Sequence, residues 1–76
     1  MRIYLLQRRD GSVNCDEYDA FVVLAPDEDT ARFIATDHGD EGGVWDDPKR
    51  VFCDYIGDMK AGNTLPQVVL GSFNAG

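Results

Sequence analysis

The fold class is decided by one stretch near the middle of the chain, Pro26-Asp27-Glu28-Asp29-Thr30-Ala31-Arg32-Phe33-Ile34-Ala35-Thr36-Asp37-His38-Gly39. Proline is favoured at the first position of a helix, and the three acids after it suit the first turn, where the helix dipole stabilises negative charge. Residues at helical spacing then share one apolar face, namely Ala31, Ile34, Ala35 and His38. Gly39 is expected to end the helix in the left-handed conformation. The stretch therefore predicts a single helix that begins at Pro26.

Short segments rich in Ile, Val, Tyr and Phe flank this helix, two on each side. The first two strands are expected over residues 2–8 and 19–25, with the second beginning as early as Asp16 because the connection between them is long for a tight hairpin. The last two are expected over residues 50–57 and 67–73. The order ββαββ predicts an α+β fold, a small antiparallel sheet of about four strands with one helix packed on one face. Seventy-six residues suit a single domain, 1–76.

Two of the expected strands are apolar on both faces, which one helix cannot cover. Phe21-Val22-Val23-Leu24 and Val68-Val69-Leu70 lack the alternation of a sheet with one face in water. The sequence leaves three alternatives for what covers the second face: a second copy of the chain, a partner, or the chain's own loops. In the last case Trp45, Tyr18 and the loop around Leu65 fold over it.

The chain carries a net charge of −7, and its acids are concentrated between Asp10 and Asp47. Twelve carboxylates and one arginine, Arg32, fall in that stretch, which leaves −11 there and +4 in the remainder of the chain. Such a field repels nucleic acid and attracts basic partners, so we expect no direct binding to DNA or RNA. The competing interpretation is a solvated surface that keeps a small protein soluble.

No motif for catalysis or for a metal is evident. The segment Asp37-His38-Gly39-Asp40-Glu41-Gly42 fails as a calcium loop, since its third position is glycine and no glutamate occupies the twelfth. The single histidine, His38, shares no local motif with Cys15 or Cys53. We therefore expect no enzyme, no metal and no cofactor. Both cysteines are expected as free thiols, with a disulfide between them as the alternative.

The expected location of the protein is the cytoplasm. No apolar run approaches the roughly 18 residues of a membrane helix, and the apolar run near the N-terminus is too short for the core of a signal peptide. We therefore expect no contact with a membrane.

Several phrases of the sequence together resemble a family of small acidic proteins of proteobacterial phages and prophages. They are Asp16-Glu17-Tyr18-Asp19-Ala20-Phe21-Val22-Val23, Ala25-Pro26-Asp27-Glu28 with Ala31-Arg32, Gly39-Asp40-Glu41-Gly42, Trp45, Ile56-Gly57 and Val69-Leu70-Gly71-Ser72-Phe73-Asn74-Ala75-Gly76. The chain is similar to the members that are anti-CRISPR inhibitors of type I systems, those of type I-C in particular. The resemblance implies a non-catalytic protein that binds the surveillance complex in the infected bacterial host and blocks target DNA binding, in the manner of an acidic DNA mimic.

The predicted partner of this acidic surface is the basic DNA-binding surface of a type I CRISPR surveillance complex. The predicted partner-binding residues are the grouped acids and two aromatic residues beside them: Asp16, Glu17, Tyr18, Asp19, Asp27, Glu28, Asp29, Asp40, Glu41, Trp45, Asp46 and Asp47. The aromatic pair would supply apolar anchors. For Trp45 the alternative is a plug over the core. The alternative function is that of a non-catalytic structural or regulatory phage protein that acts as a homodimer.

Overall fold

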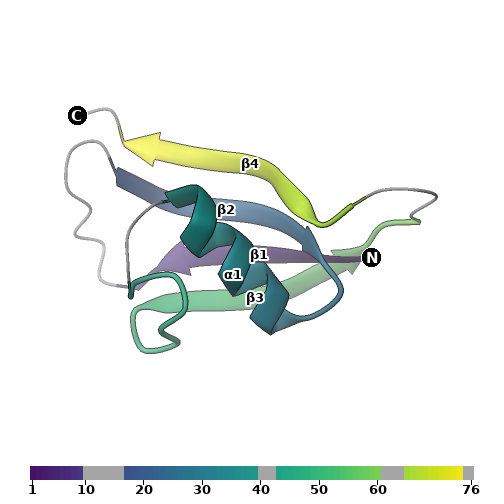
Figure 1. Cartoon of the computed structure of the whole chain (residues 1–76), viewed down its shortest axis with the longest axis horizontal. Helices are drawn as coiled ribbons and strands as arrows, with labels where there is room; N and C mark the ends of the chain where they lie inside the picture. Colours follow the sequence, from purple (N-terminus) through teal and green to yellow (C-terminus); the bar gives the residue numbers. More distant parts are fainter. Residues whose placement is uncertain (10–16, 40–42, 61–64, 75–76) are drawn as a thin grey trace.

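A four-stranded antiparallel sheet carries one helix on one of its faces (Figure 1). The structure is a computed structural model that describes residues 1–9, 17–39, 43–60 and 65–74. Its elements follow in the order β1 (Arg2–Arg8), β2 (Glu17–Ala25), α1 (Glu28–Gly39), β3 (Val51–Asp58) and β4 (Gln67–Asn74). The predicted α+β fold with ββαββ order is confirmed, and β2 begins near the earlier of its two expected starts.

The strand order across the sheet is β3-β1-β2-β4. β1 and β2 form the predicted hairpin, in which Leu5 lies opposite Val22 and Leu6 opposite Phe21. β3 pairs with the other side of β1, and since β2 and β3 are both antiparallel to β1 they run parallel to each other. Helix α1 is the crossover between them. β4 then pairs with β2, so the last two strands form opposite edges of the sheet.

Helix α1 begins two residues later than the proline predicted. The carbonyl of Asp27 accepts the first helical hydrogen bond, from the amide of Ala31 at 3.1 Å. Its side-chain oxygen Oδ1 accepts a hydrogen bond from the amide of Thr30 at 2.8 Å. These two contacts make Asp27 the N-cap of the helix. The prediction that Pro26 occupies the first helical position is therefore wrong, because Pro26 lies before the cap.

Gly39 ends α1, but the expected left-handed conformation is absent there. Among the glycines that the structure describes, the one with positive φ is Gly43, at 78°. Gly39 instead lies close to the indole of Trp45, where a Cβ atom on Gly39 would come within 2.9 Å of the indole Nε1. Glycine is thus required at this position by close packing and not by its backbone angles.

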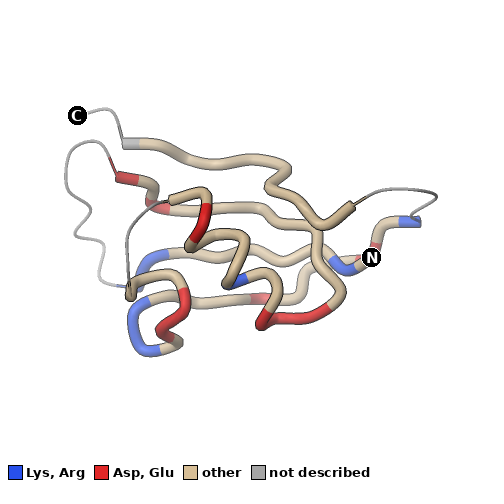
Figure 2. Tube along the Cα trace, viewed as in Figure 1, with Lys and Arg blue, Asp and Glu red and all other residues tan. Residues whose placement is uncertain are grey.

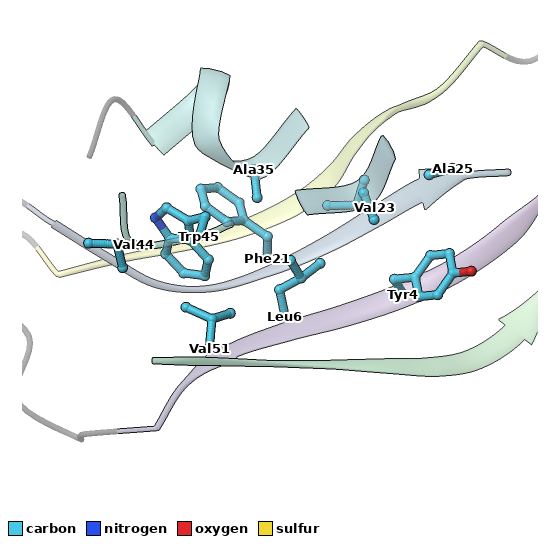
Figure 3. Packing of buried hydrophobic residues seen from close by; sticks show 10 residues of the cluster. Tyr4, Leu6, Phe21, Val23, Ala25, Ala35, Val44, Trp45 and Val51 are labelled. Atoms are coloured by element: carbon cyan, nitrogen blue, oxygen red, sulfur yellow. The ribbon is translucent and has the colours of Figure 1, made fainter. Parts of the chain in front are cut away.

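The core lies between the sheet and the layer formed by α1 and the segment that follows it (Figure 3). Its fully buried large side chains are Trp45, Phe21, Leu6, Val23 and Val51. The rings of Trp45 and Phe21 meet edge to face, with centroids 4.7 Å apart. Tyr18 lies on this side too, with its ring 4.6 Å from Phe21 and 5.5 Å from His38.

The second face of the sheet is not covered in the way that the sequence allowed. Trp45 and Tyr18 pack on the helix side, and Leu65 is 75% exposed. The expectation that Trp45 and Tyr18 fold over the second face is therefore wrong, whereas residues 61–64 of the loop around Leu65 lie outside the described residues.

Candidate functional site

Six acidic residues belong to the layer that covers the core, and we call them the acidic face. They lie on and around α1 and in the segment that follows it (Figure 2): Asp27, Glu28, Asp29, Asp37, Asp46 and Asp47. Because the layer is on one side of the sheet, these carboxylates share a side of the molecule. The two acidic runs 27–29 and 46–47 thus belong to the same layer of the molecule.

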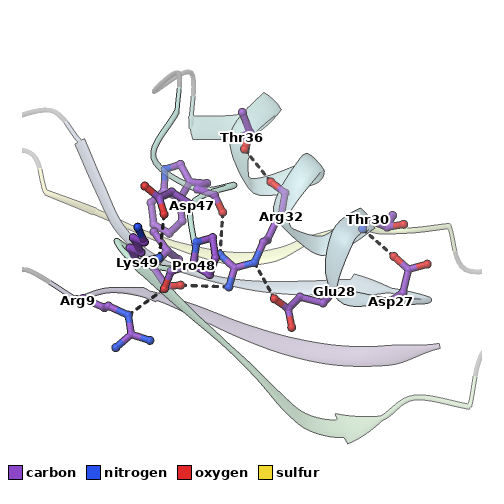
Figure 4. A network of polar contacts seen from close by, with 11 residues as sticks. Arg9, Asp27, Glu28, Thr30, Arg32, Thr36, Asp47, Pro48 and Lys49 are labelled. Carbon is purple, nitrogen blue, oxygen red and sulfur yellow. Dashed lines mark hydrogen bonds and ion pairs between the residues drawn. The ribbon is translucent and has the colours of Figure 1, made fainter.

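The one cation within this stretch is removed from the surface. Arg32 is 8% exposed, and its guanidinium makes three hydrogen bonds inside the domain (Figure 4). Its Nε donates to Glu28 Oε2 at 2.9 Å, and its two terminal nitrogens donate at 3.2 Å to the backbone carbonyls of Trp45 and Val51. Arg32 therefore ties α1 to the following segment and to β3. Between residues 17 and 47 of the described chain the acidic face therefore has no surface cation, but the exposed Lys49 and Arg50 follow Asp47 directly in the same segment (Figure 2).

Three acids of the face also hold the local structure. Asp27 caps α1, and the hydrogen bonds from Thr30 hold its pKa below the ordinary value. Glu28 pairs with Arg32 while its side chain stays 51% exposed. Oδ1 of Asp47 accepts a hydrogen bond from the amide of Lys49 at 2.9 Å, which shapes the turn that leads into β3. Substituting any of these three acids perturbs folding as well as surface charge.

In the described part of the structure, the side chains of the other three acids of the face make no structural contact of this kind. Asp29, Asp37 and Asp46 are exposed, and within the described residues none of their side chains makes a hydrogen bond or an ion pair. They are the carboxylates that are most available to a partner. Asp37 is on the acidic face although it is not among the predicted partner-binding residues. Its sequence signal is its position eight residues after Asp29, a little over two turns further along the helix.

The predicted group near the start of β2 is less available. Glu17, Tyr18 and Asp19 are all half-buried, and Tyr18 packs against Phe21, His38 and Phe73. Oδ1 of Asp19 is buried without a hydrogen-bond partner in the described structure. This group lies near the C-terminal end of α1, since Tyr18 touches His38. Asp16, Asp40 and Glu41 lie outside the described residues.

Trp45 is not an exposed anchor. Its side chain is 0% exposed and fills the space between Gly39 and Phe21, so it acts as the plug over the core that was the alternative. The physical reason is that α1, with alanine at its buried positions 31 and 35, leaves room on the sheet that a large ring from the next segment fills. Arg32 takes part in the same packing through its hydrogen bond to the carbonyl of Trp45, and it is a structural residue that the sequence analysis did not predict. Its signal was a lone arginine among acids, four residues after a glutamate.

The groups that could support catalysis or hold a metal are few. The described residues contain no cluster of three or more His, Cys, Asp or Glu side chains that could hold a metal ion. Cys53 is a free, half-buried thiol, and burial raises its pKa to about 11. That shift is opposite to the one that activates a nucleophilic cysteine. Within the described part of the chain, no helix has the length and apolar character to span a membrane.

Comparison with protein-family models, with curated protein sequences and with solved structures found no match for this chain.

Proposed function

We propose that this protein is a non-catalytic inhibitor that binds the basic, nucleic-acid-binding surface of a protein partner through its acidic face. The single observation that supports this proposal is the burial of Arg32, 8% exposed and hydrogen-bonded inside the domain. A surface that served only solubility would intersperse cations with its acids. Within residues 17–47 of the described chain the one arginine contributes to folding, and the exposed cations Lys49 and Arg50 come only after the last acid of the face.

The charge density of this face suits competition with one nucleic-acid strand. Helix α1 has 12 residues, which corresponds to a length of about 18 Å. A single DNA strand carries one phosphate per roughly 3.4 Å, or about five over that length, and a duplex carries about ten. The six carboxylates of the face are thus similar in number to the phosphates of one strand and fall short of the number in a duplex. A rigid domain that places these charges in a basic channel would exclude DNA by charge and by volume.

The resemblance to phage proteins identifies the partner that we propose. This partner is a type I CRISPR surveillance complex, which holds its nucleic acid in a positively charged channel. The proposed effect of the protein is the loss of target DNA binding in the infected bacterial host. Attraction of this kind acts over a Debye length of about 8 Å at physiological salt, so the complex should weaken steeply as salt rises.

The test is a gel-shift competition with purified type I-C surveillance complex and labelled target DNA, run with both orders of addition. Protein added first should abolish the shift, and protein added after DNA should have little effect. The decisive variant is D29K/D37K/D46K, which changes the net charge from −7 to −1 at three acids that support no internal contact. It should lose inhibition while it keeps its thermal transition.

Two matched controls accompany that variant. D29E/D37E/D46E preserves the charge and should inhibit like the wild type. D54K reverses the charge of an exposed aspartate on the face of the sheet opposite α1, and it should inhibit like the wild type. Full DNA binding in both orders of addition, or inhibition by D29K/D37K/D46K equal to that of the wild type, would contradict the proposal.

A further inference from the structure

The second face of the sheet is apolar, and we call it the open face. Because Cys53 and Tyr55 pack toward the core, the alternating Phe52 and Asp54 of β3 point to the other side. By the same alternation the open face includes Ile3 and Leu5 of β1, Val22 of β2 and Leu70 of β4. Phe52 is 42% exposed and Leu70 is 64% exposed, Ile3, Leu5 and Val22 are half-buried, and Leu24, which lies opposite Ile3, is buried.

One row of this face runs straight across the sheet. The register places Asp54 opposite Leu5, Leu5 opposite Val22, and Val22 opposite Leu70. Asp54 is the one acid within this apolar row. At one corner the guanidinium of Arg9 covers the ring of Phe52 at 3.8 Å. The charged groups in and beside this row are Asp54 and Arg9, while the acidic face lies on the far side of the sheet.

We infer that the open face is a homodimer interface, occupied by the open face of a second copy of this chain. The charge distribution favours that occupant. Apart from Asp54 and Arg9, a strongly basic or acidic partner finds little charge to bind along this row, whereas a second copy presents the same apolar row. Face-to-face packing also directs the two acidic faces outward, so the −7 charge of each copy opposes association as little as the fold allows.

The area agrees with what a dimer needs. Four strands of about eight residues give a face of about 26 Å by 19 Å, or roughly 500 Å². Two such faces bury roughly 1,000 Å² in total, which is the lower bound for a specific interface. An exposed apolar patch of this size on a small domain is typical of an interaction site. We therefore expect a dimer that forms at micromolar concentration. This inference does not rest on the proposed function.

Sedimentation equilibrium across micromolar concentrations tests it on the full chain. The wild type should approach twice the 8.4 kDa mass of the chain, and added salt should strengthen the dimer because it screens the repulsion between copies. F52K and L70K should each weaken dimerisation about tenfold or more, since each puts an unpaired charge into the interface. Both substitutions reduce the net negative charge, so general repulsion cannot account for the loss.

The matched control is F33K, because Phe33 is 71% exposed on the helix side, away from the open face. It should leave the dimer intact. D54L should tighten the dimer about tenfold, since it completes the apolar row across the sheet, and a gain of this kind cannot result from misfolding. A wild type and a D54L variant that both remain monomeric would overturn the inference. Disruption by L70K without disruption by F52K would overturn it too, because that pattern indicates pairing through the β4 edge.

Discussion

Replacement of Arg32 by methionine should destabilise the domain more than any other single change to the polar groups around α1. Methionine retains the length of the side chain but donates no hydrogen bond, so the carbonyls of Trp45 and Val51 each lose a donor at 3.2 Å. An unsatisfied buried acceptor costs about 1–3 kcal/mol. The lost pair with Glu28 adds little, since that carboxylate is 51% exposed and screened by solvent. With each carbonyl in the lower half of that range, at about 1.5 kcal/mol, the two losses amount to about 3 kcal/mol.

That loss is large on the scale of a domain with 76 residues, whose total stability is expected to be roughly 4–11 kcal/mol. At about 4–8 °C per kcal/mol, R32M should lower the melting temperature by roughly 12–24 °C. Circular dichroism during thermal and urea unfolding measures both quantities. The control is E28Q, which removes the charge of the exposed partner and leaves both carbonyl contacts in place. It should cost less than about 1 kcal/mol.

One result would refute this reasoning. Some buried ion pairs can be replaced by apolar side chains with no loss of stability, because the charges no longer have to leave water. If R32M is within about 0.5 kcal/mol of the wild type, then satisfaction of the two carbonyls does not hold the segment after α1 in place. R32K separates charge from geometry. It keeps the positive charge but cannot reproduce the three-way contact of the guanidinium, so it should fall between R32M and the wild type.

Three further predictions concern pH, thiol reactivity and packing. The pKa of Asp27 is lowered in the folded state, so its charge stabilises the fold above the unfolded pKa of about 3.9, and this contribution is lost as pH falls. D27N keeps a capping oxygen but lacks the charge, so it should be less stable than the wild type at pH 7. In acid unfolding curves the two proteins should converge as pH falls below about 4. Burial raises the pKa of Cys53 from 9.0 to about 11. In a C15S background at pH 8 the folded thiol should therefore react with a disulfide reagent roughly 100-fold more slowly than the urea-unfolded chain, and equal rates would contradict this. The same shift predicts a contribution to stability that is complete below about pH 9 and is lost as pH rises toward 11. G39A should lower stability by about 1–2 kcal/mol in urea titrations, because its Cβ would lie 2.9 Å from the buried indole, whereas G57A, with its nearest contact at 3.8 Å, should be nearly neutral.

The elements of this fold were accessible from local patterns, and their errors have local causes. Pro26 suggested a helix start two residues too early, because a side-chain cap at Asp27 competes with proline as the signal for the first turn. Gly39 suggested a left-handed cap, although its role is contact with a ring six residues later. Both errors arise where a residue type fits two local structures and a neighbour in space selects one.

The candidate site was accessible only in part. Clustering of acids along the chain is visible in the sequence, and the acidic face contains two of the predicted runs. The positions of Arg32 and Trp45 are not visible in the same way. Each residue is buried by contacts between α1, the segment after it and β3, and such contacts depend on how those elements are placed. The same dependence explains why Asp37 joined the face and why the group near Tyr18 is half-buried.

By itself the sequence determined the order and type of the elements, the excess of negative charge and the presence of more apolar surface than one helix can cover. These properties follow from periodicity, turn chemistry and composition, which act over a few residues. Only the tertiary structure decided the strand order β3-β1-β2-β4, the burial of Arg32 and the packing of Trp45 on the helix side. Packing depends on contacts between residues far apart in the chain, and among the described residues Trp45 and α1 both pack on one face, which leaves the other face exposed.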